Sequence, residues 1–367
     1  SVARKLAEEG IVLLKNDGVL PLSVGQTVAV CGEYAAPGRS GLVAGGGSAM
    51  VQWEVPFFNL PELLRNRLGS EVKYEAAFWT KGIASNWQKP YCAFLNAGES
   101  EVAVVCAGTG ADIECEGSDR DSMRLPAVQE NMILETARAN LKTVVVLFAG
   151  SALDISAWED SVAAIVWAGF CGEGGGEALA DILTGKVNPS GKLSESFPRR
   201  LEDSSSYGSY TDACVARYEE GIDVGYRCYD KRGTEVAFPF GFGLSYSEFG
   251  YSGLRLSEEN GRVRVRFSVE NLSDRDGKEV CQVYIHAGES FVYRPEKELK
   301  GFEKIFVRAK EKAETDILLD ADAFAFYSVA TDGWRTEDGV YEILVGASSR
   351  DIRLRAKIHI QKGKIVL

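Results

Sequence analysis

Residues 102–108 have the sequence VAVVCAG, a short and continuous apolar run that is rich in valine and ends in glycine. Such a run predicts a strand of a parallel sheet that is buried on both faces. Four more strand-like runs are spaced along the first 170 residues, at 27–32, 72–76, 143–150 and 163–169.

Helix-like stretches alternate with these runs. Two of them begin with a proline, at Pro61 and Pro126, and a third covers residues 176–184 and is closed by Gly185. Alternating strands and helices predict a parallel sheet with helices on both faces. We therefore expect an α/β domain, an α/β sandwich, over residues 1–200.

The composition changes after residue 200. Residues 201–249 are rich in Ser, Tyr and Gly and are predicted to be a linker segment, which Tyr226 and Arg227 attach to the domain that follows. From residue 250 the pattern has a period of two, with short strands separated by turns. This predicts an all-β, immunoglobulin-like sandwich over residues 250–367.

Composition excludes several classes of function. The net charge of −12 argues against nucleic acid or an anionic membrane as a partner, and no apolar run is long enough to span a membrane. The two histidines, His286 and His359, are too few for a His-based triad or a His-rich metal site, so we predict no metal and no organic cofactor. Eight cysteines without a CxxC pair, and the lack of a leader-like N-terminus, predict reduced thiols and a cytoplasmic location.

Polar residues follow the strand at 102–108 directly. Residues 111–120 read ADIECEGSDR, and loops at the carboxyl ends of parallel strands are where α/β proteins place ligands and active sites. Glu116 is the candidate for a working carboxylate and Glu114 is its rival. An acidic loop is more often solvated surface, so the pattern alone leaves both readings open.

Several further stretches resemble glycoside hydrolase family 3. Residues 9–22 and 188–198 resemble the two ends of the second domain of that family, and residues 218–229 and 238–246 are similar to the link that follows it. The sequence KELKGFEK at 297–304 resembles a strand of the family's fibronectin type III-like domain.

The resemblance implies a chemistry. Members of this family are retaining, exo-acting glycosidases, mostly β-glucosidases, with a nucleophilic aspartate on a (β/α)8 barrel and a glutamate as acid/base on the α/β domain. The sequence EGSDR at 116–120 is similar to the family's Glu-Gly-x-Asp-Arg motif, which implies that Glu116 is the acid/base. It implies no cofactor, and an oligosaccharide or β-glucoside as substrate.

The chain departs from the family in lacking the barrel and its nucleophile motif. The barrel is therefore expected as a separate subunit or as the rest of a longer, permuted polypeptide. The alternative is a non-catalytic carbohydrate-binding or scaffold module. The sugar, the linkage and assembly into an oligomer are left open.

The acid/base role predicts particular surroundings. A proton donor needs a raised pKa, and the acidic neighbours Asp112, Glu114 and Asp119 are expected to raise the pKa of Glu116. Arg120 would oppose this, so we expect it to pair with Asp119 instead.

Five residues are weaker candidates for binding the substrate. Arg39 and Trp53 either line the outer sugar subsite or have buried structural roles. Gly46, Gly47 and Ser48 either approach a sugar closely or form a tight turn.

Overall fold

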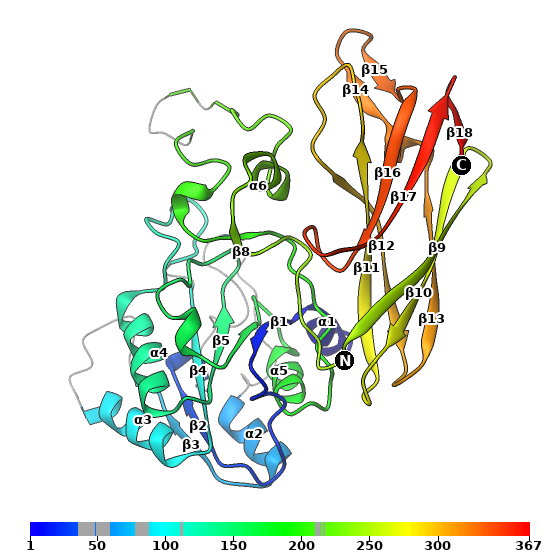
Figure 1. The fold of residues 1–367 in the computed structure, drawn as a ribbon. Helices are drawn as coiled ribbons and strands as arrows, with labels where there is room; N and C mark the ends of the chain where they lie inside the picture. The colour runs from blue at the N-terminus through cyan, green and yellow to red at the C-terminus, as the bar shows by residue number, and fades with distance from the viewer. Residues whose placement is uncertain (36–47, 49–58, 78–87, 111–112, 210–213, 216) are drawn as a thin grey trace. The chain divides into compact units, whose positions relative to one another are not determined.

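The computed structural model groups the chain into two compact units, drawn together in Figure 1. The first comprises residues 1–192, 197–201 and 243–246, and the second comprises residues 193–196, 202–242 and 247–367. The structure describes residues 1–35, 48, 59–77, 88–110, 113–209, 214–215 and 217–367.

A six-stranded sheet in the order β1-β6-β5-β4-β2-β3 forms the centre of the first unit. The last five strands are parallel, as predicted, whereas β1 pairs antiparallel with β6 at one edge. The prediction missed β1 because its short sequence VLLKN is half polar. The strands are β1 (Val12–Asn16), β2 (Val28–Cys31), β3 (Val72–Glu75), β4 (Val102–Gly108), β5 (Thr143–Phe148) and β6 (Ala164–Trp167).

Helices cover both faces of this sheet (Figure 1). Alternate strand residues point to opposite faces, so Val104 and Phe148 pack in the larger core with α2 and α5, whereas Ala103 packs with Ala97 of α3. Helix α1 packs on α5, and α4 packs on α3. The helices are α1 (Val2–Gly10), α2 (Leu60–Leu68), α3 (Gln88–Glu99), α4 (Ala127–Ala139) and α5 (Gly175–Leu183).

A buried carboxylate joins three of these segments. The side chain of Asp181 on α5 is fully buried, and its Oδ1 accepts a hydrogen bond of 2.8 Å from Nε of Arg67 at the end of α2. Its Oδ2 contacts Arg4 of α1 and lies 3.5 Å from Nζ of Lys186. The Asp181 carboxylate therefore pairs with three positive charges where α1, α2 and α5 pack together.

The end of β4 is completed by a side chain. The ladder between β4 and β2 ends at the pair Val105 and Cys31, so Gly108 has no strand partner on that side. The side chain of the buried Gln129 of α4 takes the place of a neighbouring strand. Its Oε1 accepts from the Gly108 N–H at 2.8 Å, and its Nε2 donates to the Gly108 carbonyl at 3.0 Å. A Cβ at Gly108 would lie 2.0 Å from the Phe148 carbonyl oxygen, so only glycine fits there.

The second unit is an antiparallel β-sandwich, as predicted. A three-stranded sheet in the order β13-β10-β9 faces a five-stranded sheet in the order β12-β11-β16-β17-β18, and their alternate side chains form one core. The strands are β9 (Phe249–Glu259), β10 (Arg262–Asn271), β11 (Gly277–Ala287), β12 (Glu298–Val307), β13 (Lys312–Leu319), β16 (Gly339–Gly346), β17 (Ile352–Gln361) and β18 (Lys364–Val366), with a hairpin of β14 (Phe326–Ser328) and β15 (Gly333–Arg335).

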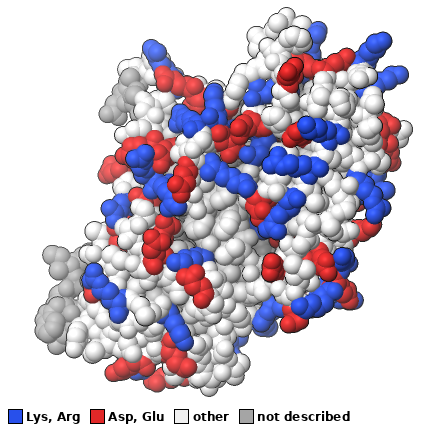
Figure 2. Space-filling view, in the orientation of Figure 1, with Lys and Arg blue, Asp and Glu red and all other residues white. Residues whose placement is uncertain are grey.

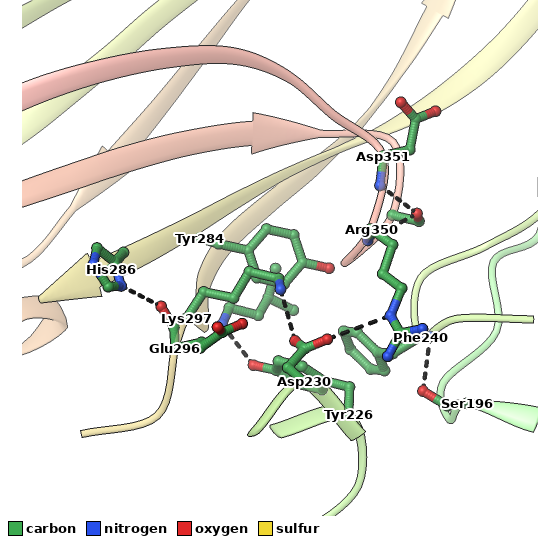
Figure 3. A network of polar contacts seen from close by, with 12 residues as sticks. Ser196, Tyr226, Asp230, Phe240, Tyr284, His286, Glu296, Lys297, Arg350 and Asp351 are labelled. Atoms are coloured by element: carbon green, nitrogen blue, oxygen red, sulfur yellow. Dashed lines mark hydrogen bonds and ion pairs between the residues drawn. The ribbon is translucent and has the colours of Figure 1, made fainter. Parts of the chain in front are cut away.

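Helix α6 (Tyr226–Arg232), from the segment before the sandwich, packs within this second unit (Figure 3). Asp230 is nearly buried and lies 2.6 Å from Nζ of Lys297 and 3.4 Å from Nε of Arg350. The Tyr226 hydroxyl accepts a hydrogen bond of 2.9 Å from the N–H of Leu299. The predicted attachment through Tyr226 is thereby confirmed, whereas Arg227 donates locally, to the Ile222 carbonyl.

Candidate functional site

Glu116 lies at the tip of a tight turn that follows β4. The Ser118 N–H donates to the Cys115 carbonyl at 3.2 Å, which closes the turn around Glu116 and Gly117. Gly117 has a φ of 78°, a left-handed conformation that favours glycine, as at the third position of a type II turn. The Glu-Gly sequence therefore presents the Glu116 carboxylate outward, and the side chain is exposed.

Glu114, two residues earlier, has the opposite surroundings. Its Oε2 accepts from the Thr109 hydroxyl at 2.8 Å and from the Gly150 N–H at 2.6 Å. Its Oε1 accepts from the Ser151 hydroxyl at 2.7 Å and from Arg120 Nη1 at 3.2 Å. Four donors hold this carboxylate, so it fastens the loop to the ends of β4 and β5.

The expected pairing of Arg120 with Asp119 is wrong. Besides Glu114, the Arg120 guanidinium donates to the Ser151 hydroxyl at 2.6 Å and to the Ser122 carbonyl at 3.4 Å, and Asp119 is exposed. Glu114 is the better partner because its carboxylate is already half-enclosed by the strand ends, where water competes less for the ion pair.

The expected direction of the Glu116 pKa is also wrong for this chain. The hydroxyl and the backbone N–H of Ser48 bond to the carboxylate and lower the pKa of Glu116 below its usual value. The N–H lies 2.7 Å from Oε2. Hydrogen bonds to the charged form outweigh desolvation, which is slight for an exposed group. The carboxylate is therefore ionised at neutral pH.

Two of the predicted site residues, Ser48 and Glu116, are thus brought together, although 68 positions separate them in the chain. This agrees with the expectation that loops from different strands meet at the carboxyl edge of the sheet. The other four candidates for substrate binding lie outside the described residues. They are Arg39, Gly46, Gly47 and Trp53.

Sequence reasoning missed the residues that hold the loop. Thr109 and Gln129 carry no motif, and their roles come from contacts that span 5 and 21 positions. At the far end of the loop, Arg124 makes two hydrogen bonds to the Glu130 carboxylate on α4, of 3.0 and 2.5 Å. The sequence could have predicted this ion pair, because Arg124 and Glu130 lie on either side of Pro126, where the helix was predicted to start.

Charges of both signs are interspersed over the face seen in Figure 2. Within the described part of the chain, no three His, Cys, Asp or Glu side chains are grouped so that they could hold a metal ion. None of the helices in that part is long and apolar enough to cross a membrane. None of the eight cysteines forms a disulfide bond.

Known proteins share both units. Residues 11–246 match the glycosyl hydrolase family 3 C-terminal domain, and residues 279–349 match a fibronectin type III-like domain. The chain is 38% identical over 367 residues to the thermostable β-glucosidase B of Acetivibrio thermocellus, covering 98% of this chain and 48% of that protein. It is 36% identical over 363 residues to an exo-α-(1→6)-L-arabinopyranosidase of Bifidobacterium breve, covering 96% of this chain and 47% of that protein.

A solved structure agrees with the fold. The crystal structure of the family 3 β-glucosidase of Bifidobacterium adolescentis superposes with a TM-score of 0.90 and 35% identity, over 98% of this chain and 52% of that one. The chain spans about half the length of these relatives. With a C-terminal domain match that covers most of its length and a fibronectin type III-like domain behind it, the chain belongs to glycosyl hydrolase family 3.

Proposed function

We propose that this chain forms the acid/base half of the active site of a retaining, exo-acting β-glycosidase, with Glu116 as the general acid/base. The observation that supports this most is the exposed carboxylate at the tip of a rigidly held turn, at the carboxyl edge of a parallel sheet, in a family 3 chain. The nucleophile, an aspartate on a barrel domain or subunit, lies outside this chain.

Retaining hydrolysis sets what each half does. Two carboxyl groups must stand about 5–5.5 Å apart across the scissile bond. The barrel aspartate attacks the anomeric carbon while Glu116 donates its proton to the departing oxygen. Glu116, now a carboxylate, then takes a proton from the water that releases the sugar from the aspartate.

The lowered pKa of Glu116 in this chain is consistent with the second step but not with the first. A proton donor must be protonated near neutrality, and burial of the carboxylate raises its pKa. A barrel and a substrate that cover Glu116 would supply that burial. The acid/base thus depends on assembly for its function as an acid.

The names of two relatives support glycosides with a terminal sugar as the class of substrate. The two relatives above are named for glucoside and for arabinopyranoside hydrolysis, and we propose β-glucosides as the substrates of this chain's enzyme. The full exposure of Glu116 favours one alternative, a non-catalytic carbohydrate-binding or scaffold module, in which this carboxylate carries out no chemistry.

Kinetics of the Glu116→Ala variant in the full-length protein distinguish the two. We expect hydrolysis of alkyl glucosides to fall at least a hundredfold, because their leaving groups need the proton. Glycosylation of the enzyme by 2,4-dinitrophenyl glucoside should be spared, because this leaving group needs no proton. Azide should restore turnover, because it attacks the anomeric carbon in place of water without needing a base, and releases the sugar from the aspartate as β-glucosyl azide.

The matched control is Asp119→Ala, which removes an exposed carboxylate from the same loop. Asp119→Ala should leave the rates of hydrolysis of both substrates unchanged. If Glu116→Ala and Asp119→Ala lower the rates of hydrolysis equally and only slightly, Glu116 is not the acid/base. That result would favour the non-catalytic module.

A further inference from the structure

A cavity of about 630 Å³ opens on the second unit. Three lining residues come from neighbouring strands: His286 of β11, Glu342 of β16 and Lys357 of β17. We call these three the floor of the cavity. Phe291, Glu337 and Asp338 line it from two loops at one end of the sandwich, and we call these three its rim. Its size is typical of sites that hold a small organic molecule. All of its lining residues belong to the second unit.

Two of the four carboxylates that line this cavity, Glu337 and Asp338, already accept hydrogen bonds. Glu337 accepts from the Ser290 hydroxyl at 2.5 Å and from the Phe291 N–H at 3.2 Å, so it shapes the loop that carries Phe291. Asp338 accepts from the N–H groups of Lys362 and Gly363, at 2.7 and 3.1 Å. These acids build the rim and are not available to strip the water from a metal ion.

The floor is a set of neutral or balanced hydrogen-bonding groups. Glu342 and Lys357 form an ion pair of 3.2 Å. Nδ1 of His286 is bonded to the Glu296 carbonyl (Figure 3), and because a carbonyl only accepts, Nδ1 carries the proton. Nε2, the other ring nitrogen, is an acceptor in this tautomer. Donors and acceptors therefore lie side by side on this floor.

An aromatic ring stands at the rim. The side chain of Phe291 is 99% exposed, which is unusual for phenylalanine in a folded chain. The loop that carries it is nevertheless held by Glu337, so the ring is displayed on a fixed support. A flat apolar face beside a hydrogen-bonding floor suits a ligand that has both C–H faces and hydroxyl groups.

Other ligand classes fit less well. An anion would meet more carboxylates than ammonium groups, and a metal ion would find no group of three ligands among the described residues. A peptide strand would need a free sheet edge, whereas Glu342 on β16 already has His286 of β11 as its register partner on one side and Lys357 of β17 on the other.

We propose that this cavity binds a short neutral oligosaccharide, with hydroxyl groups on His286, Glu342 and Lys357 and a sugar ring against Phe291. The site belongs to the sandwich and needs no catalytic step, so the proposal goes beyond the acid/base function and does not rest on it. It gives the sandwich a carbohydrate-binding role of its own.

Titration of the 367-residue chain with cellotetraose and xylotetraose, followed by nuclear magnetic resonance and calorimetry, tests this. We expect millimolar or tighter binding of at least one tetrasaccharide, with perturbed signals at residues 286, 291 and 357. Phe291→Ala should weaken binding about tenfold, as expected for the loss of an aromatic contact. Lys357→Met should also weaken it.

Phe306→Ala is the matched control, because Phe306 is another exposed phenylalanine of the second unit, on β12, and does not line the cavity. It should leave the affinity within twofold of the parent chain. Absence of binding of both tetrasaccharides at 10 mM would overturn the proposal. So would equal losses in Phe291→Ala and Phe306→Ala, or a self-association that covers Phe291.

Discussion

Glu114 and Glu116 share one loop and differ in everything that decides their chemistry. Among the described residues, the Glu114 carboxylate accepts from four donors, whereas the Glu116 carboxylate accepts from Ser48. The oxygens of the first are thus occupied by the protein, whereas the second is exposed to a ligand. This contrast supports Glu116 over Glu114 as the proposed acid/base.

Ser48→Ala should raise the pKa of Glu116, because the Ser48 hydroxyl stabilises the charged form and is lost. In the isolated chain, the ¹³C signal of the Glu116 carboxyl group should titrate at higher pH. In the full-length enzyme, the alkaline limb of kcat/KM, which reports the acid, should move to higher pH. Ser118→Ala, in the same loop, is the control, and a pKa that falls or stays would contradict this assignment.

Glu114→Gln should destabilise the first unit by about 2–3 kcal/mol, since it removes the charge from a carboxylate with four donors and leaves Arg120 without its partner. Urea denaturation of the 367-residue chain measures this. Asp119→Asn, at an exposed site of the same loop, should change the free energy of unfolding by less than about 0.5 kcal/mol. Similar values for the two variants would argue against a structural role for Glu114.

How far the sequence predicts this site depends on the range of each contact. The apolar run before the loop and the Glu-Gly pair are local signals, and both the strand and the turn follow from them. The bond from Ser48 to Glu116 spans 68 positions and the bond from Arg120 to Ser151 spans 31, and no spacing rule relates such residues. The direction of the Glu116 pKa depended on the Ser48 contact, so it was predicted with the wrong sign.

At the scale of elements, α6 joins the sandwich through a nearly buried ion pair. Asp230→Asn should lower the stability of the second unit by about 3 kcal/mol, because it leaves Lys297 buried without its counter-charge. Chemical denaturation followed by the nuclear magnetic resonance signals of Val283 and Ile285, which are buried in the sandwich core, reports the change. The exposed pair of Asp274 and Lys310 is a fitting control, and Asp274→Asn should cost at most about 1 kcal/mol.

The packing of α1, α2 and α5 predicts a pH dependence. Burial disfavours the charge of Asp181, but the hydrogen bond and charge of Arg67, with the charges of Arg4 and Lys186, hold its pKa below the ordinary value. A lowered pKa contributes stability that is complete above the unfolded-state pKa of about 3.9 and is lost as the pH falls through the folded-state pKa.

The stability of the first unit should therefore decline below about pH 4. The decline should be shallower in Asp181→Asn, which is itself less stable at pH 7 by about 3–5 kcal/mol. Urea denaturation between pH 2.5 and 7 measures both. Parallel curves for the parent chain and the variant would show that Asp181 is not responsible.

For the whole molecule, the proposal predicts that the 367-residue chain alone does not hydrolyse p-nitrophenyl β-D-glucoside. Only one of the two carboxyl groups of a retaining mechanism is expected within it. Release of p-nitrophenol is the measurement, with the full-length protein as the positive control. Hydrolysis by the isolated chain that Glu116→Ala abolishes would show that a second working carboxylate lies in these residues.

Both ends of the loop that carries Glu116 are bonded to helix α4. Gly108, before the loop, bonds to Gln129, and Arg124, after it, bonds to Glu130. The described parts of this loop, residues 109–110 and 113–123, have therefore lost conformational entropy already when the chain folds. On the proposed function, a barrel that docked over Glu116 would meet a turn at residues 115–118 that is already ordered. The entropy cost of docking at this turn would then be small, and the bond from Ser48 would be the contact to be exchanged.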